Sequence, residues 1–203
     1  PRSQFKESSA GTVQSLDRAL TVLTAIAAAE RVTLSDLSRD VGIPAATLHR
    51  ILTTLQTHGY AAFDGERQQW RIGIEAYRTG TSFLERSSVL ETGQPFMHRL
   101  MQDTGETANI GLRAGPDVVY VAQVETTNPI RAFFAPGTRS SMHASGTGKA
   151  ILAAMDASTL ERVLAAMPMT PLTPNTHVDR HSLERDLTGI RARGWAHDSD
   201  EHH

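Results

Sequence analysis

Residues 32–60 constrain the fold most, because they carry two short amphipathic helices joined by a tight turn. The apolar positions of the first helix recur at helical spacing and are Leu34, Leu37 and Val41. Gly42 then permits a sharp bend. Pro44 can open the next helix, since its missing N–H would have no partner in a first turn. The apolar stripe of that second helix is Leu48, Ile51, Leu52 and Leu55.

The second helix leaves small, polar and cationic side chains away from its apolar stripe. An α-helix with such a face fits the major groove of DNA, where short side chains approach the bases and an arginine reaches guanine. The segment therefore predicts a helix-turn-helix that binds double-stranded DNA, the alternative being a solvated helix face. The predicted contacts on this helix are Ala45, Ala46, Thr47, His49, Arg50 and Thr53.

The first helix of the pair offers one further candidate, Ser35. Thr33 fits the N-cap position, with Asp36 three residues on in the place of a capping-box acid. Ser35 can then either present its hydroxyl and backbone N–H to a phosphate or take part in first-turn capping. The sequence leaves both roles open.

A hairpin is predicted after the helices, over residues 60–73, with its turn at Asp64-Gly65. Arg67 and Arg71 would lie on this hairpin as phosphate contacts. A further helix is predicted at residues 12–29, and its apolar face is Leu16, Ala19, Leu20, Leu23, Ile26 and Ala27. Three helices and a hairpin make a winged helix-turn-helix DNA-binding domain at residues 12–73.

Composition restricts how such a domain can bind. The chain of 203 residues is 39% hydrophobic and 21% charged, with a net charge of −2. Residues 1–75 carry eight Lys or Arg and eight Asp or Glu, which is a weak electrostatic footprint for DNA. Useful affinity therefore requires two or more copies. No apolar run approaches the ~18 residues of a membrane span, and the absence of cysteine agrees with a reducing cytoplasm.

The rest of the chain predicts a linker and an α+β domain. Residues 74–87 form the linker helix, in which Tyr77 and Phe83 are candidate subunit contacts. The domain at residues 88–203 mixes helices with strands. Helices are expected at 88–103, 145–155, 158–167 and 182–193, and strands at 107–113, 118–124 and 130–134. Pro95 suggests a kink or a late start of the first of these helices. Gly194-Trp195 resembles the entry to another strand, so an incomplete domain is expected.

Four segments together resemble the isocitrate lyase regulator (IclR) family of bacterial transcription factors. They are VQSLDRALTVL at 13–23, LSDLSRDVGIPAATLHRILTTLQTHGY at 34–60, TGETANIGLRAGPDVVYVAQVE at 104–125 and MHASGTGKAILA at 142–153. The resemblance implies a winged helix, a linker helix and a C-terminal effector domain with a curved antiparallel sheet like that of GAF and PAS sensors. It also implies homodimers or dimers of dimers. The expected ligands are small organic acids or aromatic catabolites, and repression is the commoner outcome.

Residues 145–149, Ser-Gly-Thr-Gly-Lys, are the candidate effector contact. A phosphate loop is excluded, because His143 and Ala150 occupy positions that require Gly and Ser or Thr. A small-residue loop that opens a helix can still hold a carboxylate on free backbone N–H groups. Close helix–sheet packing is the alternative explanation. The predicted effector contacts are Ser145, and Gly146 and Thr147 by resemblance, with Met142 and Ile130 as apolar walls.

Metal and catalytic sites are not expected. His177 and His181 have helical spacing, but their stretch begins in a Pro-rich loop and lacks a clear third ligand. Asp198 and Glu201 are taken as a solvated acidic loop. We therefore predict a regulator without cofactors. The competing functions are a small-molecule enzyme fused to a DNA-binding module and a module that mediates protein contacts only.

Overall fold

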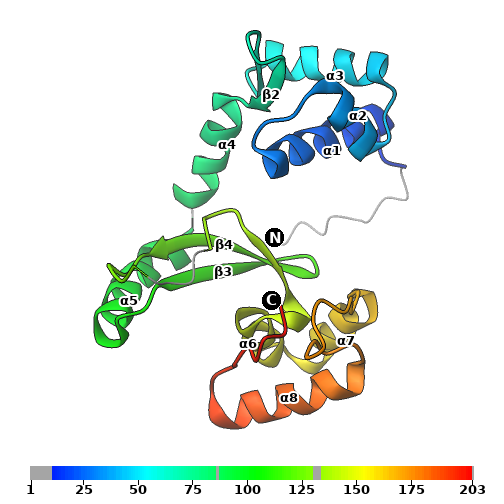
Figure 1. Ribbon diagram of the computed structural model, residues 1–203. Coiled ribbons are helices and arrows are strands. Elements are labelled where there is room, and N and C mark those ends of the chain that lie inside the picture. The colour runs from blue at the N-terminus through cyan, green and yellow to red at the C-terminus, as the bar shows by residue number, and fades with distance from the viewer. Residues whose placement is uncertain (1–10, 86, 130–133, 203) are drawn as a thin grey trace, which may run out of the picture. The chain divides into compact units, whose positions relative to one another are not determined.

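The computed structural model describes residues 11–85, 87–129 and 134–202. The chain divides into two compact units, residues 1–86 and 87–203 (Figure 1). Among the described residues, no helix combines the length and apolar character needed to cross a bilayer.

The first unit is a winged helix-turn-helix, as predicted. Its helices are α1 (Gln14–Ala29), α2 (Leu34–Val41) and α3 (Ala45–Thr57), followed by the antiparallel pair β1 (Ala61–Asp64) and β2 (Gln69–Ile72). Thr33 caps α2 by accepting from the Asp36 N–H at 3.2 Å, and Gly42 ends it with a φ of 65°. The buried core is Val22, Ile26, Val32, Leu37, Ile43, Leu48, Leu52, Ala61 and Trp70.

The predicted core face of α1 is wrong in part. Val22 and Ile26 are fully buried, whereas Leu16 and Leu20 are 58% and 56% exposed. Because α2, α3 and β2 contact only one side of α1, the helix keeps a second apolar stripe in solvent.

The hairpin forms where predicted, but its turn is longer than a two-residue one. Asp64 is still paired, with Gln69, so residues 65–68 make the loop. The Asp64 carboxylate accepts from the backbone N–H groups of Glu66 and Arg67, both at 3.1 Å, and these bonds hold its pKa below the usual range. The left-handed residue is Gln68 (φ 55°) rather than Gly65. An Asx turn thus replaces the expected tight turn.

The base of the hairpin is fixed to the end of α3 by two glycines. Gly59 ends the helix region with a φ of 73°, and a Cβ on Gly73 would lie 2.1 Å from the Gly59 carbonyl oxygen. The same carbonyl accepts from the N–H of Glu75 at 3.1 Å, in the first turn of α4 (Ile74–Glu85). The Tyr60 hydroxyl also lies 2.9 Å from that of Thr79 on α4. The linker helix therefore starts as a continuation of the winged helix.

The second unit is α+β, with a three-stranded antiparallel sheet of order β3-β4-β5. Its elements are α5 (Ser88–Thr104), β3 (Ala108–Ala114), β4 (Asp117–Val124), β5 (Arg139–Ser141), the 3-10 turn η1 (Met142–Ala144), α6 (Gly146–Ala153), α7 (Ala157–Ala166) and α8 (Arg180–Arg193). Ile110 faces α5, since a Cβ on Gly93 would lie 2.6 Å from its Cδ1. Gly111 faces Thr147 of α6, so the two helices pack against opposite faces of the sheet.

Three local predictions for this unit need correction. α5 runs through Pro95 from Ser88, so the expected late start is wrong. Residues 130–133 of the strand expected at 130–134 lie outside the described residues, and Phe134, which is described, is not in a strand. The short strand β5 was not predicted. No strand follows Gly194 in the described residues 195–202. Gly194 instead ends α8 with a φ of 83°.

Candidate nucleic-acid interface and effector site

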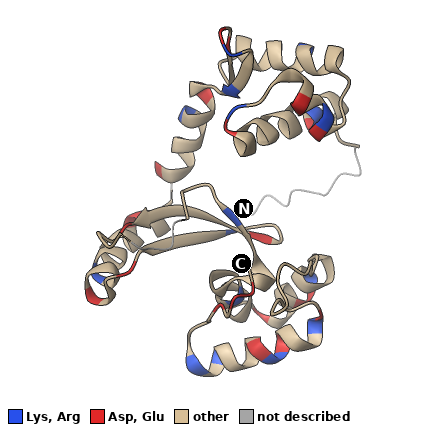
Figure 2. Cartoon of the chain, viewed as in Figure 1, with Lys and Arg blue, Asp and Glu red and all other residues tan. Residues whose placement is uncertain are grey.

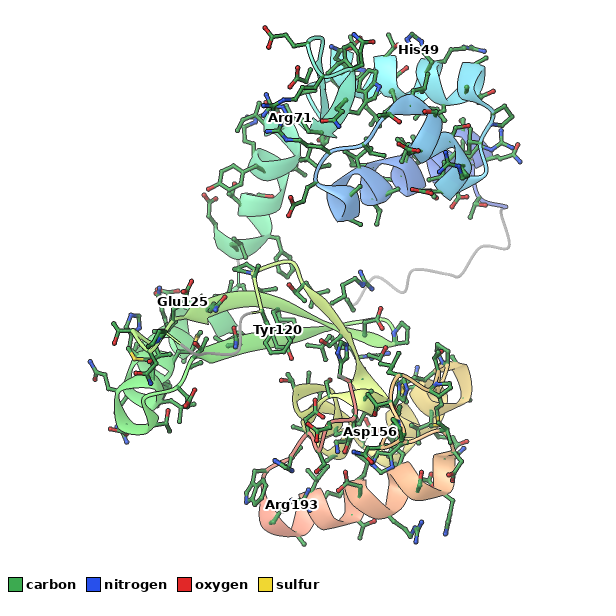
Figure 3. All side chains as sticks on the ribbon, in the orientation of Figure 1. His49, Arg71, Tyr120, Glu125, Asp156 and Arg193 are labelled. Atoms are coloured by element: carbon green, nitrogen blue, oxygen red, sulfur yellow. The ribbon has the colours of Figure 1, made fainter. Side chains whose placement is uncertain are left out.

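The predicted contact face of α3 lies on the surface. Leu48 and Leu52 are fully buried on one side of the helix. Away from them, Thr47 is half-buried, and the other predicted contacts on this helix are exposed, namely Ala45, Ala46, His49, Arg50 and Thr53. Figure 3 shows His49 on α3 and Arg71 on the hairpin of the same unit. The sequence thus places each of these side chains where a duplex can meet it.

Thr53 and Thr54 of α3 have their hydroxyl hydrogens engaged along the helix. The Thr53 hydroxyl donates to the His49 carbonyl at 2.8 Å, and the Thr54 hydroxyl donates to the Arg50 carbonyl at 3.0 Å. The Thr53 methyl group remains available for an apolar contact. Together with Ala45 and Ala46, it forms a surface suited to the thymine methyl group in a major groove.

Three arginines of this unit form no ion pair among the described residues. Arg50, Arg67 and Arg71 are exposed, and no carboxylate oxygen of the described residues lies within 4.0 Å of their guanidinium groups. Arg31 and Arg39, by contrast, pair with Asp64 at 3.8 Å and with Asp36 at 3.0 Å. Figure 2 shows these charges on the ribbon. Three arginines thus remain available for an external anion.

Ser35 is exposed, and its hydroxyl lies 3.0 Å from that of Thr33. Thr33, rather than Ser35, caps α2, and its hydroxyl also donates to the Asp36 carboxylate at 2.7 Å. This bond, with the charge of Arg39, holds the pKa of Asp36 below its usual range. Ser35 therefore joins the capping network while its outer surface stays accessible.

At the candidate effector site, two predicted contacts have structural roles. Ser145 is 3% exposed and is the N-cap of α6, because its hydroxyl accepts from the Gly148 N–H at 3.1 Å and donates to the Ser141 carbonyl at 3.0 Å. Met142 is fully buried in the core with Val118 and Leu152. Ile130 lies outside the described residues.

The next residues of α6 divide between packing and exposure. A Cβ on Gly148 would lie 2.3 Å from the Met142 Cα, so this glycine permits close packing. Gly146 and Thr147 are half-buried. A Cβ on Gly146 would face the Asp198 nitrogen at 3.5 Å and the Ala196 oxygen at 3.6 Å, both ordinary contacts. The start of α6 therefore faces the backbone of residues 196–198.

Lys149 forms a buried ionic cluster that the sequence did not reveal. Its ammonium group, 1% exposed, donates to Asp186 at 2.8 Å and to Glu201 at 2.6 Å. Glu201 is 5% exposed, so the expectation of a solvated acidic loop is wrong for this residue. The carboxylates lie 37 and 52 residues from Lys149, and no local pattern joins them.

Burial alone would raise the pKa of Asp186, but the hydrogen bonds and charges of Lys149 and Arg193 outweigh it and hold the pKa below its usual value. His177 joins the same cluster, with its Nε2 3.5 Å from the Asp186 carboxylate. His177, Asp186 and Glu201 are close enough together to be considered as metal ligands. However, the Lys149 ammonium already contacts both carboxylates, which suits a structural ion cluster better than a metal centre.

A winged helix with unpaired arginines, joined to an α+β domain, defines a helix-turn-helix transcriptional regulator. The IclR helix-turn-helix domain matches residues 15–65, and the bacterial transcriptional regulator IclR C-terminal domain matches residues 81–203. The chain belongs to the IclR family of bacterial transcriptional regulators.

Named relatives are regulators as well. The HTH-type transcriptional regulator BhcR of Paracoccus denitrificans is 44% identical, over 94% of this chain and 68% of its own length. The transcriptional repressor IclR of Escherichia coli is 35% identical, over 95% and 71%. Among solved structures, Thermotoga maritima IclR is similar with a TM-score of 0.64 and 25% identity, over 94% of this chain and 77% of its own. An Alicyclobacillus acidocaldarius regulator has the same fold, with a TM-score of 0.80 and 24% identity, over 95% and 78%.

Proposed function

We propose that the chain is a cytoplasmic repressor that binds operator DNA as a homodimer or dimer of dimers and is controlled by a small organic acid or aromatic catabolite. The exposed face of α3 carries this proposal, because it joins small side chains to an arginine without an internal partner. Repression is supported by the relatives named as repressors. The relatives' naming as regulators also favours binding over turnover as the mode of action.

Each predicted DNA contact has a distinct role in this proposal. Arg50 donates to guanine, and His49 and Thr47 flank it at base edges or phosphates. The methyl groups of Ala45, Ala46 and Thr53 approach thymine. Arg67 and Arg71 contact phosphate, since a cation neutralises a phosphate without needing a fixed register, and Ser35 adds a phosphate contact at the start of α2.

Two copies are needed because the binding domain carries no excess positive charge. Two helices of the first unit, α1 and α4, leave apolar side chains exposed that a second copy could cover. Leu16 and Leu20 of α1 are exposed, and Tyr77 and Phe83 of α4 are 69% and 57% exposed. In a dimer, the two recognition helices would contact half-sites about 34–36 Å apart, or a multiple of that distance.

The effector is proposed to bind at the start of α6. Gly146 and Thr147 are half-exposed, and their backbone N–H groups lie at the positive end of the helix dipole, which favours a carboxylate. Met142, which is buried in the core, would support this site by packing rather than by contacting the effector. The effector shifts the population between two arrangements of the subunits, and the shift is limited by its differential affinity for them.

The DNA-binding role is tested by selecting an operator from a random duplex library with the wild-type chain and then measuring how tightly variants bind it. Arg50→Ala is expected to weaken binding by about 1–3 kcal/mol and to relax the sequence preference at one position. Arg39→Ala is the matched control, because Arg39 is already paired with Asp36. Failure to select any sequence, or equal binding by the Arg50 variant, would overturn the assignment of α3.

A thermal-shift screen of small carboxylates tests the effector site separately. A ligand at a hundred times its Kd adds about 2.7 kcal/mol to stability. Gly146→Ala is expected to keep the fold, because its Cβ makes ordinary contacts, and to reduce the shift. An unchanged shift in that variant would place the ligand elsewhere.

A further inference from the structure

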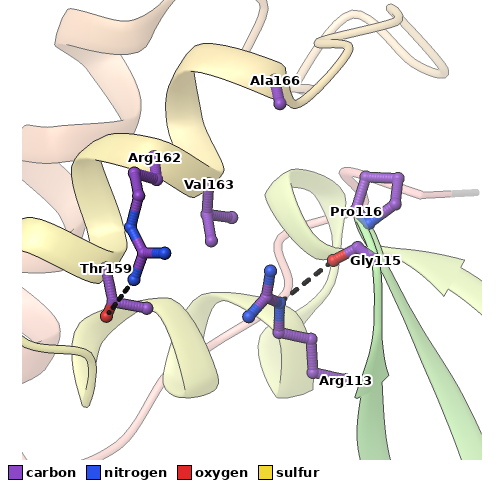
Figure 4. Close-up of a pocket in the computed structure, with 7 residues that line it drawn as sticks. All are labelled: Arg113, Gly115, Pro116, Thr159, Arg162, Val163 and Ala166. Carbon is purple, nitrogen blue, oxygen red and sulfur yellow. Dashed lines mark hydrogen bonds between the residues drawn. The ribbon is translucent and has the colours of Figure 1, made fainter. Parts of the chain in front are cut away.

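A second pocket in the effector unit is lined by two arginines from separate elements. The end of β3 contributes Arg113, the turn after it contributes Gly115 and Pro116, and α7 contributes Thr159, Arg162, Val163 and Ala166. The pocket has a volume of about 220 Å³, and it shares no lining residue with the candidate effector site at Gly146 and Thr147. Figure 4 shows both guanidinium groups directed into the same space.

The fold fixes both arginines toward this pocket. Arg113 lies directly across the β3–β4 pair from Val118, so both side chains are on one face of the sheet. Val118 is fully buried in the same core as Val163 of α7. Arg113 therefore lies beside this core, near the turn of α7 that carries Arg162.

Each guanidinium is anchored through one side only. Arg113 donates from Nε to the Gly115 carbonyl at 3.1 Å. Arg162 donates from Nη2 to the Thr159 hydroxyl at 3.1 Å and from Nε to the Ser158 carbonyl at 3.4 Å. Since a guanidinium has five N–H donors, both groups keep several for another acceptor.

Neither guanidinium has a carboxylate within 4.0 Å in the part of the chain that the structure describes. Other arginines of this unit do have such partners: Arg139 pairs with Asp117 at 3.0 Å, and Arg193 with Asp186 at 3.2 Å. Two cations in one pocket repel each other unless an anion lies between them. The pocket thus combines unused donors with uncompensated positive charge.

We propose that this pocket binds a small carboxylate, distinct from the ligand at the start of α6. Guanidinium groups match carboxylates in planar, two-point hydrogen bonds. Val163, Ala166 and Pro116 give the lining an apolar part, which suits a short hydrocarbon portion. A short dicarboxylate satisfies both arginines and contacts this apolar wall.

Calorimetric titration of the whole chain with succinate, at constant ionic strength, tests the proposal. Saturable binding is expected, and Arg113→Gln and Arg162→Gln should each weaken it by about tenfold or more, since each removes a charge-assisted hydrogen bond. Arg185→Gln, on the exposed side of α8, is the matched control and should bind like the wild type. Because all three arginines are exposed, the melting temperatures should stay equal.

Two further arms separate this pocket from the other candidates. Gly146→Ala should leave succinate binding unchanged, whatever its effect on the ligand at α6. Inorganic phosphate should bind more weakly than succinate, because it makes no use of the apolar wall. Four results would overturn the proposal. They are the absence of saturable succinate binding, binding as tight as wild type in both glutamine variants, loss of binding in Gly146→Ala alone, and tighter binding of phosphate than of succinate.

Discussion

Two groups of cationic side chains, one in each unit, are used in opposite ways. On the winged helix, Arg50, Arg67 and Arg71 are exposed and unpaired within the described residues. In the effector unit, Lys149 is 1% exposed and contacts two carboxylates. An unpaired cation at the surface costs little in water, whereas a buried one requires partners. The three surface arginines are therefore available to an external anion, whereas Lys149 stabilises the effector unit.

The largest expected effect comes from removing the buried cation. Lys149→Met leaves Asp186 and Glu201 without their ammonium partner, and breaking such a buried pair costs about 3–5 kcal/mol. Hydrogen exchange measured by mass spectrometry should show faster opening of α6 and α8 and little change in α3.

The exposed Arg185→Met is the control for that experiment and should change stability by no more than about 0.5 kcal/mol. A loss of stability below about 1 kcal/mol in Lys149→Met would contradict the structural role of Lys149, because the buried cluster would then contribute no more than a surface pair.

Packing glycines give the next effect. A Cβ on Gly148 meets the backbone of Met142 at 2.3 Å, so Gly148→Ala should destabilise the effector unit by about 1–3 kcal/mol. Gly80 on α4 has no atom within 4 Å of its Cβ position, so Gly80→Ala should stabilise its helix by up to about 1 kcal/mol. Thermal unfolding measures both, and shifts of the same sign would contradict the packing argument.

The hairpin arginines, Arg67 and Arg71, can be tested through the salt dependence of DNA binding. Arg67→Ala or Arg71→Ala should weaken binding to all DNA sequences alike and lower the slope of log affinity against log salt by about one, since each removes a phosphate contact. Fluorescence anisotropy with selected and scrambled duplexes measures this. Arg31→Ala, whose guanidinium already pairs with Asp64 at 3.8 Å, should alter the slope least. A loss confined to the selected sequence would make the wing arginine a base contact.

Acid gives the smallest expected effect, through Asp186 of the buried cluster. Because the pKa of Asp186 is lowered in the folded state, its contribution is complete above the unfolded value of about 3.9 and is lost as the pH falls through the lower folded value. Asp186→Asn should flatten the stability of the effector unit below about pH 4, measured by chemical unfolding. If the loss of stability below about pH 4 is the same in Asp186→Asn as in the wild type, other carboxylates control the acid sensitivity of this unit.

Local chemistry explains why the winged helix was predictable. The capping Thr33, the left-handed Gly42 and Gly59, and the apolar stripe of α3 all act within a few residues, so they are visible in the sequence. Asp64 shows the limit, because an Asx turn and a tight hairpin begin with the same residue. The general position of the hairpin was right, and only its turn differed.

Long-range contacts explain what the sequence did not show. Lys149 finds Asp186 and Glu201 across large separations, so Glu201 looked like a residue of a solvated loop. β5 has three residues, too few for a period-two pattern, and within the described residues it pairs with β4 alone. The start of α6 was located correctly, but Ser145 and Met142 are engaged in capping and in the core. The family resemblance thus indicated the segment at the start of α6, but the roles of its individual residues depend on tertiary contacts that the sequence does not show.

The contact between Gly59 and Gly73 has a mechanical consequence. It joins α3, the hairpin and the start of α4 into one connected segment. Across this joint the Gly73 N–H donates to the Tyr60 carbonyl at 2.9 Å and the Glu75 N–H donates to the Gly59 carbonyl at 3.1 Å. Tilting α3 alone would require breaking this joint. In the proposed dimer, a ligand would therefore change operator binding by moving each of these connected segments as a whole, and a side chain at position 73 would disrupt the joint within each of them.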